Sequence, residues 1–345
     1  MHGDGLSLNT CHLMLMSLAT FVCFRPAPRP SFLPPDPLPL SAPVCPCMGL
    51  LVNMTEQPPS GWKLHQLNSG VDDELLSCLK CSFDEDGFVC LASLFDDETV
   101  QRLREAASLN FDECFQRLYD GGHTPFPTYR DANSEGNENR YAISRGVTGG
   151  FKEIVMRSPG RFEMPFGCDR EPFSNDEIIN NGVLLRIVYS LFSGDDYYMC
   201  NMSIVNATPD SADQGWHADG GHINLQAHEE SHCFNVFVPL VDVDAALGPT
   251  ELRPGSHYLT RNLAPMMLAA KARGKLRKPV MPLLRAGDAL LFDYRILHRG
   301  RANISDIDRP ILVMTFAKRT FKDRLNFSTK SIHDSPTNAG DKVEE

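Results

Sequence analysis

Two histidines and an aspartate carry the clearest chemical signal in the sequence. His217 and Asp219 are separated by one residue, Ala218, and His298 follows 81 residues after the first histidine. Two imidazoles and one carboxylate can occupy one face of an octahedral ferrous ion and leave three positions open, an arrangement typical of non-haem iron(II) oxygenases. The absence of a thiolate from the set disfavours a structural zinc site. We therefore predict an iron(II) site made by His217, Asp219 and His298.

Arg309 stands 11 residues after the second histidine. A guanidinium group presents parallel N–H donors that match a carboxylate, so an arginine here can anchor a dicarboxylate co-substrate. An ordinary surface arginine is the alternative, but Arg309 directly precedes the apolar run 311–317, which favours a place near the core. We predict that Arg309 binds the co-substrate.

Strands must bring these residues together. Side chains repeat with a period of two along a strand, so His217 and Asp219 would project to the same side. His298 is distant in sequence and must come from another strand or strand end. A jelly roll, in which two facing sheets present side chains into one barrel mouth, meets this requirement.

The hydrophobic pattern supports such a fold. In residues 233–241, alternate apolar side chains from Phe234 to Leu240 share one face, which is typical of a strand. The region 84–95 predicts a turn and a short strand. Further strands are predicted at residues 183–192, 197–205, 280–284, 289–292 and 311–317. The predicted fold class is mainly β with flanking helices, a double-stranded β-helix or jelly roll.

A helix is expected before the strands. Asp96 and Asp97 are N-cap candidates for a helix through about Leu109, and residues 110–120 can extend it. The later segment 149–164 carries basic residues among apolar ones. It predicts either a lid on the substrate side or an edge strand with its loop, and the pattern does not choose between them.

The predicted jelly-roll domain with its helical layer covers residues 70–328. A low-complexity, proline-rich extension precedes it at residues 1–65, and a polar tail follows at 329–345; both compositions are typical of disorder. The apolar run at residues 12–24 is too short for a confident membrane span and lacks a basic segment before it. We expect no membrane span.

Charge and cysteine usage narrow the class of protein. The formal net charge is −11, which disfavours nucleic acid as a partner because phosphate binding needs clustered Lys and Arg. The 11 cysteines are scattered and odd in number, so we expect reduced thiols and a cytoplasmic protein. The N-terminal run leaves organellar or secretory targeting open.

Several longer motifs surround the predicted ligands. They are GWHAD at 215–219, GPTELRPGSH at 248–257, GD at 287–288, LHRGRAN at 297–303 before Arg309, and DGFVCLASLFDDETVQRLR at 86–104. With these motifs in this order, the chain resembles the phytanoyl-CoA dioxygenase family of iron(II)/2-oxoglutarate-dependent oxygenases. The resemblance spans roughly residues 80–320.

The resemblance implies a site and a reaction. His217, Asp219 and His298 would bind Fe(II), and Arg309 would pair with the distal carboxylate of 2-oxoglutarate. Dioxygen would be consumed, succinate and carbon dioxide released, and a C–H bond of a small organic substrate hydroxylated. Related halogenases replace the carboxylate ligand by a small residue, so Asp219 favours hydroxylation. We include ascorbate among the cofactors to be considered.

A second contact to 2-oxoglutarate is expected from elsewhere in the chain. Some family members have a hydroxyl residue two positions after the second histidine, but this sequence has Gly300 there. Asn201, Ser203 and Asn235 lie on predicted strands and are candidates for cofactor binding.

Other readings stay open. Hydroxylation of protein side chains, or AlkB-like nucleic-acid demethylation, would use the same ligands. A jelly-roll binding protein with a vestigial metal site is the non-catalytic alternative. His222 can compete as a ligand but is better explained as a pocket residue. His228 and His232 lie in a polar loop and are expected to face solvent.

Overall fold

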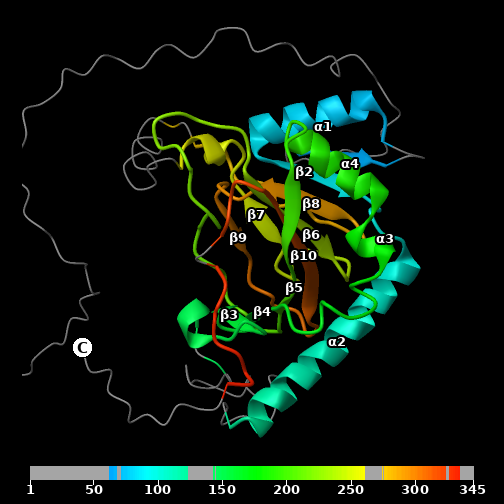
Figure 1. Cartoon of the computed structure of the whole chain (residues 1–345), viewed down its shortest axis with the longest axis vertical. Helices are drawn as coiled ribbons and strands as arrows, with labels where there is room; N and C mark the ends of the chain where they lie inside the picture. Colours follow the sequence, from blue (N-terminus) through cyan, green and yellow to red (C-terminus); the bar gives the residue numbers. More distant parts are fainter. Residues whose placement is uncertain are drawn as a thin grey trace, which may run out of the picture. The chain divides into compact units, whose positions relative to one another are not determined.

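The structure is a computed structural model, drawn in Figure 1, and it describes residues 62–67, 71–122, 143, 145–260, 274, 276–323 and 326–334. The predicted N-terminal extension lies outside the described residues up to residue 61, as does the predicted tail from residue 335. None of the helices in the described ranges is long and apolar enough to cross a lipid bilayer.

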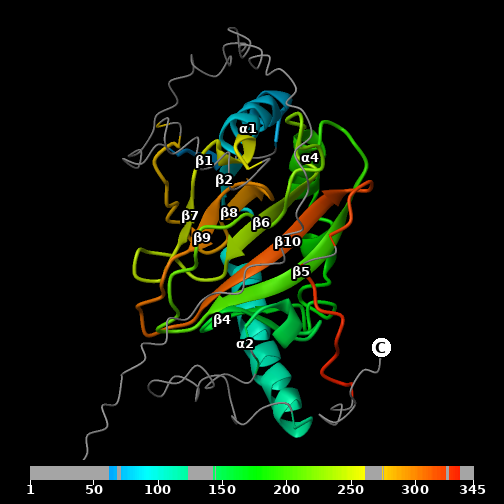
Figure 2. The same ribbon diagram turned by 90° about the vertical axis from the view of Figure 1, so that its left-hand side faces the viewer.

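A large sheet forms the centre of the fold. Its strand order is β1-β2-β8-β6-β10-β5-β4-β3, in which β1 and β2 are parallel and the other pairs antiparallel. The strands are β1 (Leu64–Gln66), β2 (Phe88–Ala92), β3 (Val155–Ser158), β4 (Arg161–Met164), β5 (Tyr197–Ala207), β6 (Cys233–Pro239), β8 (Ala289–Asp293) and β10 (Arg309–Lys318). Figure 2 shows β6, β10 and β5 side by side.

A second, smaller sheet pairs β7 (Thr250–Leu252) with β9 (His298–Gly300). Isolated bridges extend it, because His217 pairs with His298 and Leu252 pairs with Val280. The two sheets, with helices at their flank, confirm the predicted fold class of a mainly β jelly roll.

Helices cover one face of the large sheet, on the side away from β7 and β9 (Figure 1). They are α1 (Asp73–Asp86), α2 (Asp97–Asp120), α3 (Asp176–Ile179) and α4 (Gly182–Leu191), with short 3-10 turns η4 (Val147–Gly149) and η5 (Ser256–Tyr258). The Asp96 carboxylate accepts a hydrogen bond from the Thr99 amide, which confirms the predicted cap. The helix then runs through the whole predicted extension to Asp120.

The alternation along each central strand separates a core face from a cavity face. In β6, Phe234, Val236 and Val238 are buried in the core beneath the helices, whereas Asn235 and Phe237 line a cavity on the opposite face. Strand β10 divides in the same way. Its core face carries Leu312, Met314 and Phe316, and its cavity face carries Arg309, Val313 and Thr315. The helical layer therefore supplies hydrophobic stabilisation without occupying the face that carries the polar residues.

The prediction of a strand at residues 183–192 is wrong, because this segment forms helix α4. Leu184, Ile187, Val188 and Leu191 are buried at helical spacing, and the side chain of Asn181 caps the first turn by accepting from the Leu184 amide. A short, continuous apolar run fits either a buried strand or a buried helix, so its periodicity alone could not decide.

Two other segments also differ from expectation. Residues 280–284 contribute one bridge, at Val280, rather than a strand. The expected turn at the start of 84–95 is instead the last turn of α1, which ends at Gly87 with a φ of 83°. A Cβ atom there would lie 2.5 Å from His257 Nδ1, so both backbone conformation and space call for glycine.

The histidines of the 227–232 loop are less accessible than predicted. His232 is only 5% exposed, and its ring packs against Phe321 with 4.6 Å between centroids. Burial lowers the pKa of His232 to about 4, and burial with nearby Lys63 lowers the pKa of His65 to about 4. His228 is half-buried, and burial lowers its pKa to about 3.

These pKa values predict a loss of stability in acid. The folded state keeps His232 neutral while the unfolded chain protonates it, so the stability is full above about pH 6.5 and falls as the pH decreases towards 4. The contribution of His232 lost between pH 7 and pH 5 should be about 1–2 kcal/mol.

Urea unfolding of metal-free protein at pH 7 and pH 5 measures this loss. His232→Gln should make the free energy of unfolding less sensitive to pH, while exposed His333→Gln, the matched control, should not. An unchanged pH dependence in His232→Gln would contradict the assignment.

Candidate metal centre and its cavity

Backbone pairing brings the two predicted histidine ligands together. His298 opens β9, and His217 lies in an extended segment that forms an antiparallel bridge with it. The His217 amide donates to the His298 carbonyl at 3.1 Å, and the His298 amide donates back to His217 at 2.9 Å. The prediction that His298 comes from another strand is confirmed.

Asp219 follows in a turn rather than in a continuous strand. The amide of Gly220 donates to the Tyr294 carbonyl at 3.0 Å, which ties this turn to the end of β8. A Cβ atom at Gly220 would lie 2.4 Å from the Tyr294 ring, so the close approach depends on glycine. The two-residue spacing brings His217 and Asp219 together as expected, although a bend replaces the expected strand.

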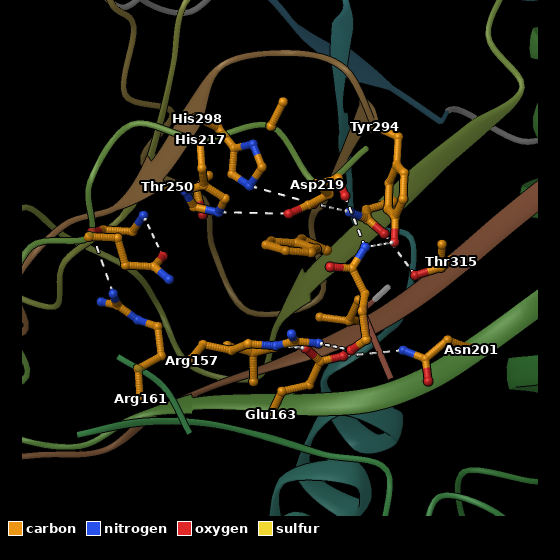
Figure 3. A pocket seen from close by; sticks show the side chains of 18 of the residues that line it. Arg157, Arg161, Glu163, Asn201, His217, Asp219, Thr250, Tyr294, His298 and Thr315 are labelled. Carbon is orange, nitrogen blue, oxygen red and sulfur yellow. Dashed lines mark hydrogen bonds and ion pairs between the residues drawn. The ribbon is translucent and has the colours of Figure 1, made fainter. Parts of the chain in front are cut away.

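The ligand atoms of the three residues converge. His217 Nε2 lies 3.7 Å from Asp219 Oδ1, and His298 Nε2 lies 3.6 Å from Asp219 Oδ2 (Figure 3). One ligand atom from each residue lies within 4.8 Å of the others. Neighbouring ligands about 2.1 Å from one ion are about 3 Å apart, so each His–Asp distance would contract by roughly 0.6–0.7 Å for these atoms to share a metal.

The hydrogen bonds of the imidazoles fit a metal site. His217 Nδ1 lies 2.9 Å from the Gly215 carbonyl, and His298 Nδ1 lies 3.1 Å from the Ile296 carbonyl. Because a carbonyl only accepts, each Nδ1 carries a proton, and each Nε2 faces Asp219 and is the nitrogen that could bind a metal. Burial lowers the pKa of His298 to about 4, which favours the neutral form that a metal needs.

Two asparagines hold Asp219. Asn235 Nδ2 donates to Asp219 Oδ2 at 2.7 Å, and Thr315 Oγ1 donates to Asn235 Oδ1 at 2.7 Å. Asn326 Nδ2 donates to the backbone carbonyl of Asp219 at 2.9 Å. The structure thus places Asn235, a candidate co-substrate contact, against the metal-binding carboxylate, where it can orient the ligand.

A cavity of about 420 Å³ contains the converging residues. Its lining comes from both sheets and from the segment after β10 (Figure 3). The lining residues are Arg145, Arg157, Arg161, Glu163, Asn201, Val205, Gln214, Gly215, Trp216, His217, Ala218, Asp219, Asn235, Phe237, Thr250, Tyr294, His298, Gly300, Arg309, Val313, Thr315, Asn326 and Phe327. The cavity therefore joins the predicted metal ligands and Arg309 in one space.

Arg309 is a buried cation in this cavity. It is 2% exposed, one of its terminal nitrogens donates to the Gly248 carbonyl, and its Nε has no hydrogen-bond partner. No carboxylate among the described residues lies within ion-pair distance of it. Burial, and then the nearby charge of Arg161, lower the pKa of Arg309. An anion entering the cavity would relieve this cost.

Arg161 is a second buried arginine on the cavity wall, and the sequence did not single it out as a site residue. Its terminal nitrogen donates to the Arg301 carbonyl at 2.7 Å, while its Nε has no partner. Burial lowers the pKa of Arg161 to about 10. A Cβ atom at Gly300 would lie 2.8 Å from Arg161 Cζ, so the glycine where a hydroxyl residue was expected makes room for this guanidinium.

Asn201 belongs to a hydrogen-bond network on the opposite wall. Its Nδ2 donates to Glu163 Oε1 at 3.3 Å, and Ser203 Oγ donates to the same oxygen at 3.0 Å. Arg157 Nε donates to Glu163 Oε2 at 2.6 Å. Asn201 on β5 and Arg157 on β3 both line the cavity. The segment 149–164 contains the antiparallel pair β3 and β4 at the edge of the large sheet, as the edge-strand alternative predicted.

Two further polar residues, His222 and Asn303, lie outside the cluster of possible metal ligands. His222 Nε2 lies 3.0 Å from Thr260 Oγ1, and His222 is outside the three-residue cluster. Asn303 Nδ2 donates to the carbonyls of Ala207 and Ile307 and so binds backbone near the end of β5.

Both a protein family and several solved structures resemble this chain. The family model described as phytanoyl-CoA dioxygenase (PhyH) matches residues 83–311. Among solved structures, the non-haem α-ketoglutarate-dependent carbocyclase SnoK from nogalamycin biosynthesis is 17% identical, covers 72% of this chain and 84% of its own, and has a TM-score of 0.47. AviO1 from Streptomyces viridochromogenes Tue57 is 18% identical, covers 72% of this chain and 96% of its own, and has a TM-score of 0.48.

Removing the support of Asp219 should weaken metal binding. Asn235→Ala deletes the donor to Asp219 Oδ2, and the loss of such an outer contact typically costs about 10- to 100-fold in metal affinity. Anaerobic titration with Fe(II), followed by equilibrium dialysis, measures the affinity. Asn180→Ala, which removes an exposed amide on α3, should retain the wild-type value. Equal affinities in all three proteins would contradict the role assigned to Asn235.

Proposed function

The chain belongs to the phytanoyl-CoA dioxygenase family of iron(II)- and 2-oxoglutarate-dependent oxygenases, and on that premise we propose that it hydroxylates a C–H bond of a small organic substrate. Succinate and carbon dioxide would be the co-products. The observation that carries the proposal is the convergence of two imidazoles, one carboxylate and a buried, carboxylate-free arginine in one cavity.

His217, Asp219 and His298 would hold the metal through Nε2 of each imidazole and the carboxylate. When bound, iron(II) with 2-oxoglutarate and dioxygen supplies the oxidative chemistry that couples decarboxylation to C–H hydroxylation. The protein's own part is to fix the tautomers of both histidines, to hold the Asp219 carboxylate and to keep water from the buried side of the site.

Arg309 would bind the distal carboxylate of 2-oxoglutarate. Its buried position and its orphan Nε leave a donor available to an anion that reaches the bottom of the cavity. Charge-assisted contacts of this kind are about twice as strong as neutral hydrogen bonds. The pairing would also offset the cost of burying an arginine without a carboxylate.

Arg161 would supply the second co-substrate contact that Gly300 does not provide. Its charge acts on Arg309, its guanidinium borders Gly300, and its Nε has no partner. Asn201, the other cofactor candidate from the sequence, has its amide engaged by Glu163 and Ser203. We therefore prefer Arg161 over Asn201 for this role.

Hydroxylation of a small molecule fits better than the alternatives. Asp219 remains as a ligand, whereas a halogenase would need that position for halide. A cavity of about 420 Å³ is in the range of small-molecule sites. A vestigial metal site would not be expected to keep all three ligand residues close together. The net charge of −11 disfavours a nucleic-acid substrate.

The first test uses the metal and co-substrate alone. Anaerobic addition of Fe(II) and 2-oxoglutarate should give a weak visible charge-transfer band, because the 2-oxo group and the adjacent carboxylate of the co-substrate would bind the metal. His298→Ala should abolish the band, and Asn180→Ala should retain it. Failure of the wild-type protein to form the band would refute the oxygenase proposal.

The substrate can then be found from a metabolite extract. Succinate release above the substrate-free rate identifies active fractions, and mass spectrometry should show a product heavier by one oxygen atom. Ascorbate remains a prediction and forms a separate arm of the assay. A chlorinated product with chloride present would contradict hydroxylation.

Arg161 and Arg309 should differ in their effect on co-substrate affinity. Arg309→Leu removes the primary anchor and should raise the Kd of 2-oxoglutarate by 100-fold or more, on the order of 3 kcal/mol. Arg161→Gln should raise it by about 10-fold, since a single charge-assisted contact is lost. Titration of the charge-transfer band at fixed Fe(II) measures both values.

Arg299→Gln is the matched control, because this arginine borders His298 in sequence but pairs with Glu251. It should leave the Kd within about twofold of wild type. A wild-type Kd in Arg161→Gln would show that the second contact lies elsewhere.

A further inference from the structure

A short segment after β10 returns to the cavity. We call Asn326–Asp334 the C-terminal strap. Asn326 and Phe327 line the cavity, although the match to the family model ends at residue 311. The strap is therefore a part of the site wall that the family match does not cover.

The far end of the strap is fixed to the body of the domain. Glu153 accepts hydrogen bonds from Ser331 Oγ at 2.7 Å and from the Ile332 amide at 3.0 Å. Ile332 is 3% exposed and belongs to the main hydrophobic core. The Lys152 amide donates to the Lys330 carbonyl at 2.7 Å. Ser331 and Ile332 are thus buried against the fold, whereas Thr329, Lys330, His333 and Asp334 are exposed.

The near end of the strap contacts the turn that carries Asp219. Asn326 Nδ2 donates to the Asp219 carbonyl at 2.9 Å, to Asp323 Oδ2 at 2.7 Å and to Tyr294 Oη at 3.1 Å. Tyr294 Oη in turn donates to Asp323 Oδ2. One amide thus joins the strap, the end of β8 and the metal-binding turn.

The backbone of Asn326 makes a further connection. Its carbonyl accepts a hydrogen bond from Arg157 Nη2 at 2.8 Å, and Arg157 is paired with Glu163 on the opposite wall. Asn326 is therefore held between the wall formed by β3 and β4 and the turn after His217.

We propose that Asn326 is a positioning residue for the metal centre, which fixes the backbone of the Asp219 turn while Asn235 fixes the carboxylate. Gly220 and Gly221 follow Asp219, so the turn has little intrinsic rigidity of its own. A ligand held at both its carbonyl and its carboxylate keeps one orientation when metal binds. The inference rests on the proposed iron(II) site.

Asn326→Asp gives the sharpest test, because it retains the shape of the side chain and replaces the N–H donor by an acceptor. The carboxylate would face the Asp219 carbonyl and Asp323, so the bond would be lost and repulsion added. Asn326→Ala removes the bond without the repulsion. Asn326→His restores an N–H donor at Nδ1 and serves as the rescue variant.

The readout is the electron paramagnetic resonance spectrum of the Fe(II)–2-oxoglutarate complex treated anaerobically with nitric oxide. We expect altered rhombicity or multiple species in Asn326→Asp and Asn326→Ala, with Fe(II) affinity lower by about 10-fold. Amide hydrogen exchange of metal-free protein should be faster over residues 217–222. Asn326→His should return both measurements towards wild type.

Ser328→Ala is the matched control. It removes a hydrogen bond from the same strap to the Gly150 carbonyl but no contact to the metal-binding turn. It should retain the wild-type spectrum, affinity and exchange. If it changes them as much as Asn326→Ala does, the strap acts only through general stability and the inference is overturned.

The remaining outcomes are also decisive. Wild-type spectrum, Fe(II) affinity and exchange in Asn326→Ala would overturn the inference, whether or not Asn326→Asp folds. Absence of a nitrosyl signal from the wild-type protein would instead refute the proposed iron site. In that case the exchange rates of metal-free protein still decide whether Asn326 holds the Asp219 turn.

Discussion

The site depends on one pair of backbone hydrogen bonds, those between His217 and His298. They join segments that are 81 residues apart and set the two imidazole rings 4.4 Å apart between centroids. Once both backbones are fixed, the carbonyls of Gly215 and Ile296 each accept a hydrogen bond from one Nδ1–H group, and Nε2 faces Asp219. Sheet pairing therefore determines the ligand geometry and also the ligand tautomers.

The large sheet lets a polar cavity exist beside a well-packed core. Side chains of β6 and β10 that face the helices are apolar and buried, so those contacts can stabilise the domain. The alternate residues of the same strands point to the other face, where polar side chains can line the cavity. Asn235 and Thr315 show the result, since they lie opposite each other on β6 and β10 and hydrogen-bond in support of Asp219.

The sequence predicted those residues of the candidate site whose side-chain type alone indicates metal or carboxylate binding. His217, Asp219, His298 and Arg309 do lie in one cavity, as predicted, because few side chains can bind iron(II) or a dicarboxylate and because the surrounding motifs occur in a fixed order. The helix α4 was mistaken for a strand because a ten-residue apolar segment has no distinctive period.

Arg161 and Asn326 were missed for a different reason. Their importance arises from tertiary contacts with Gly300 and Asp219, which no spacing in the sequence encodes. The unexpected glycine at position 300 was a usable signal, because it indicated that some other residue must fill that space.

The charge of the cavity also explains why Asp219 can be the single carboxylate ligand. Glu163 is the other acidic residue of the lining, but Arg157, Asn201 and Ser203 engage both of its oxygens. This network pairs Glu163 with Arg157 and holds it on the far wall, outside the cluster of His217, Asp219 and His298. The lining arginines then outnumber the acids, which would favour the entry of the proposed dianionic co-substrate.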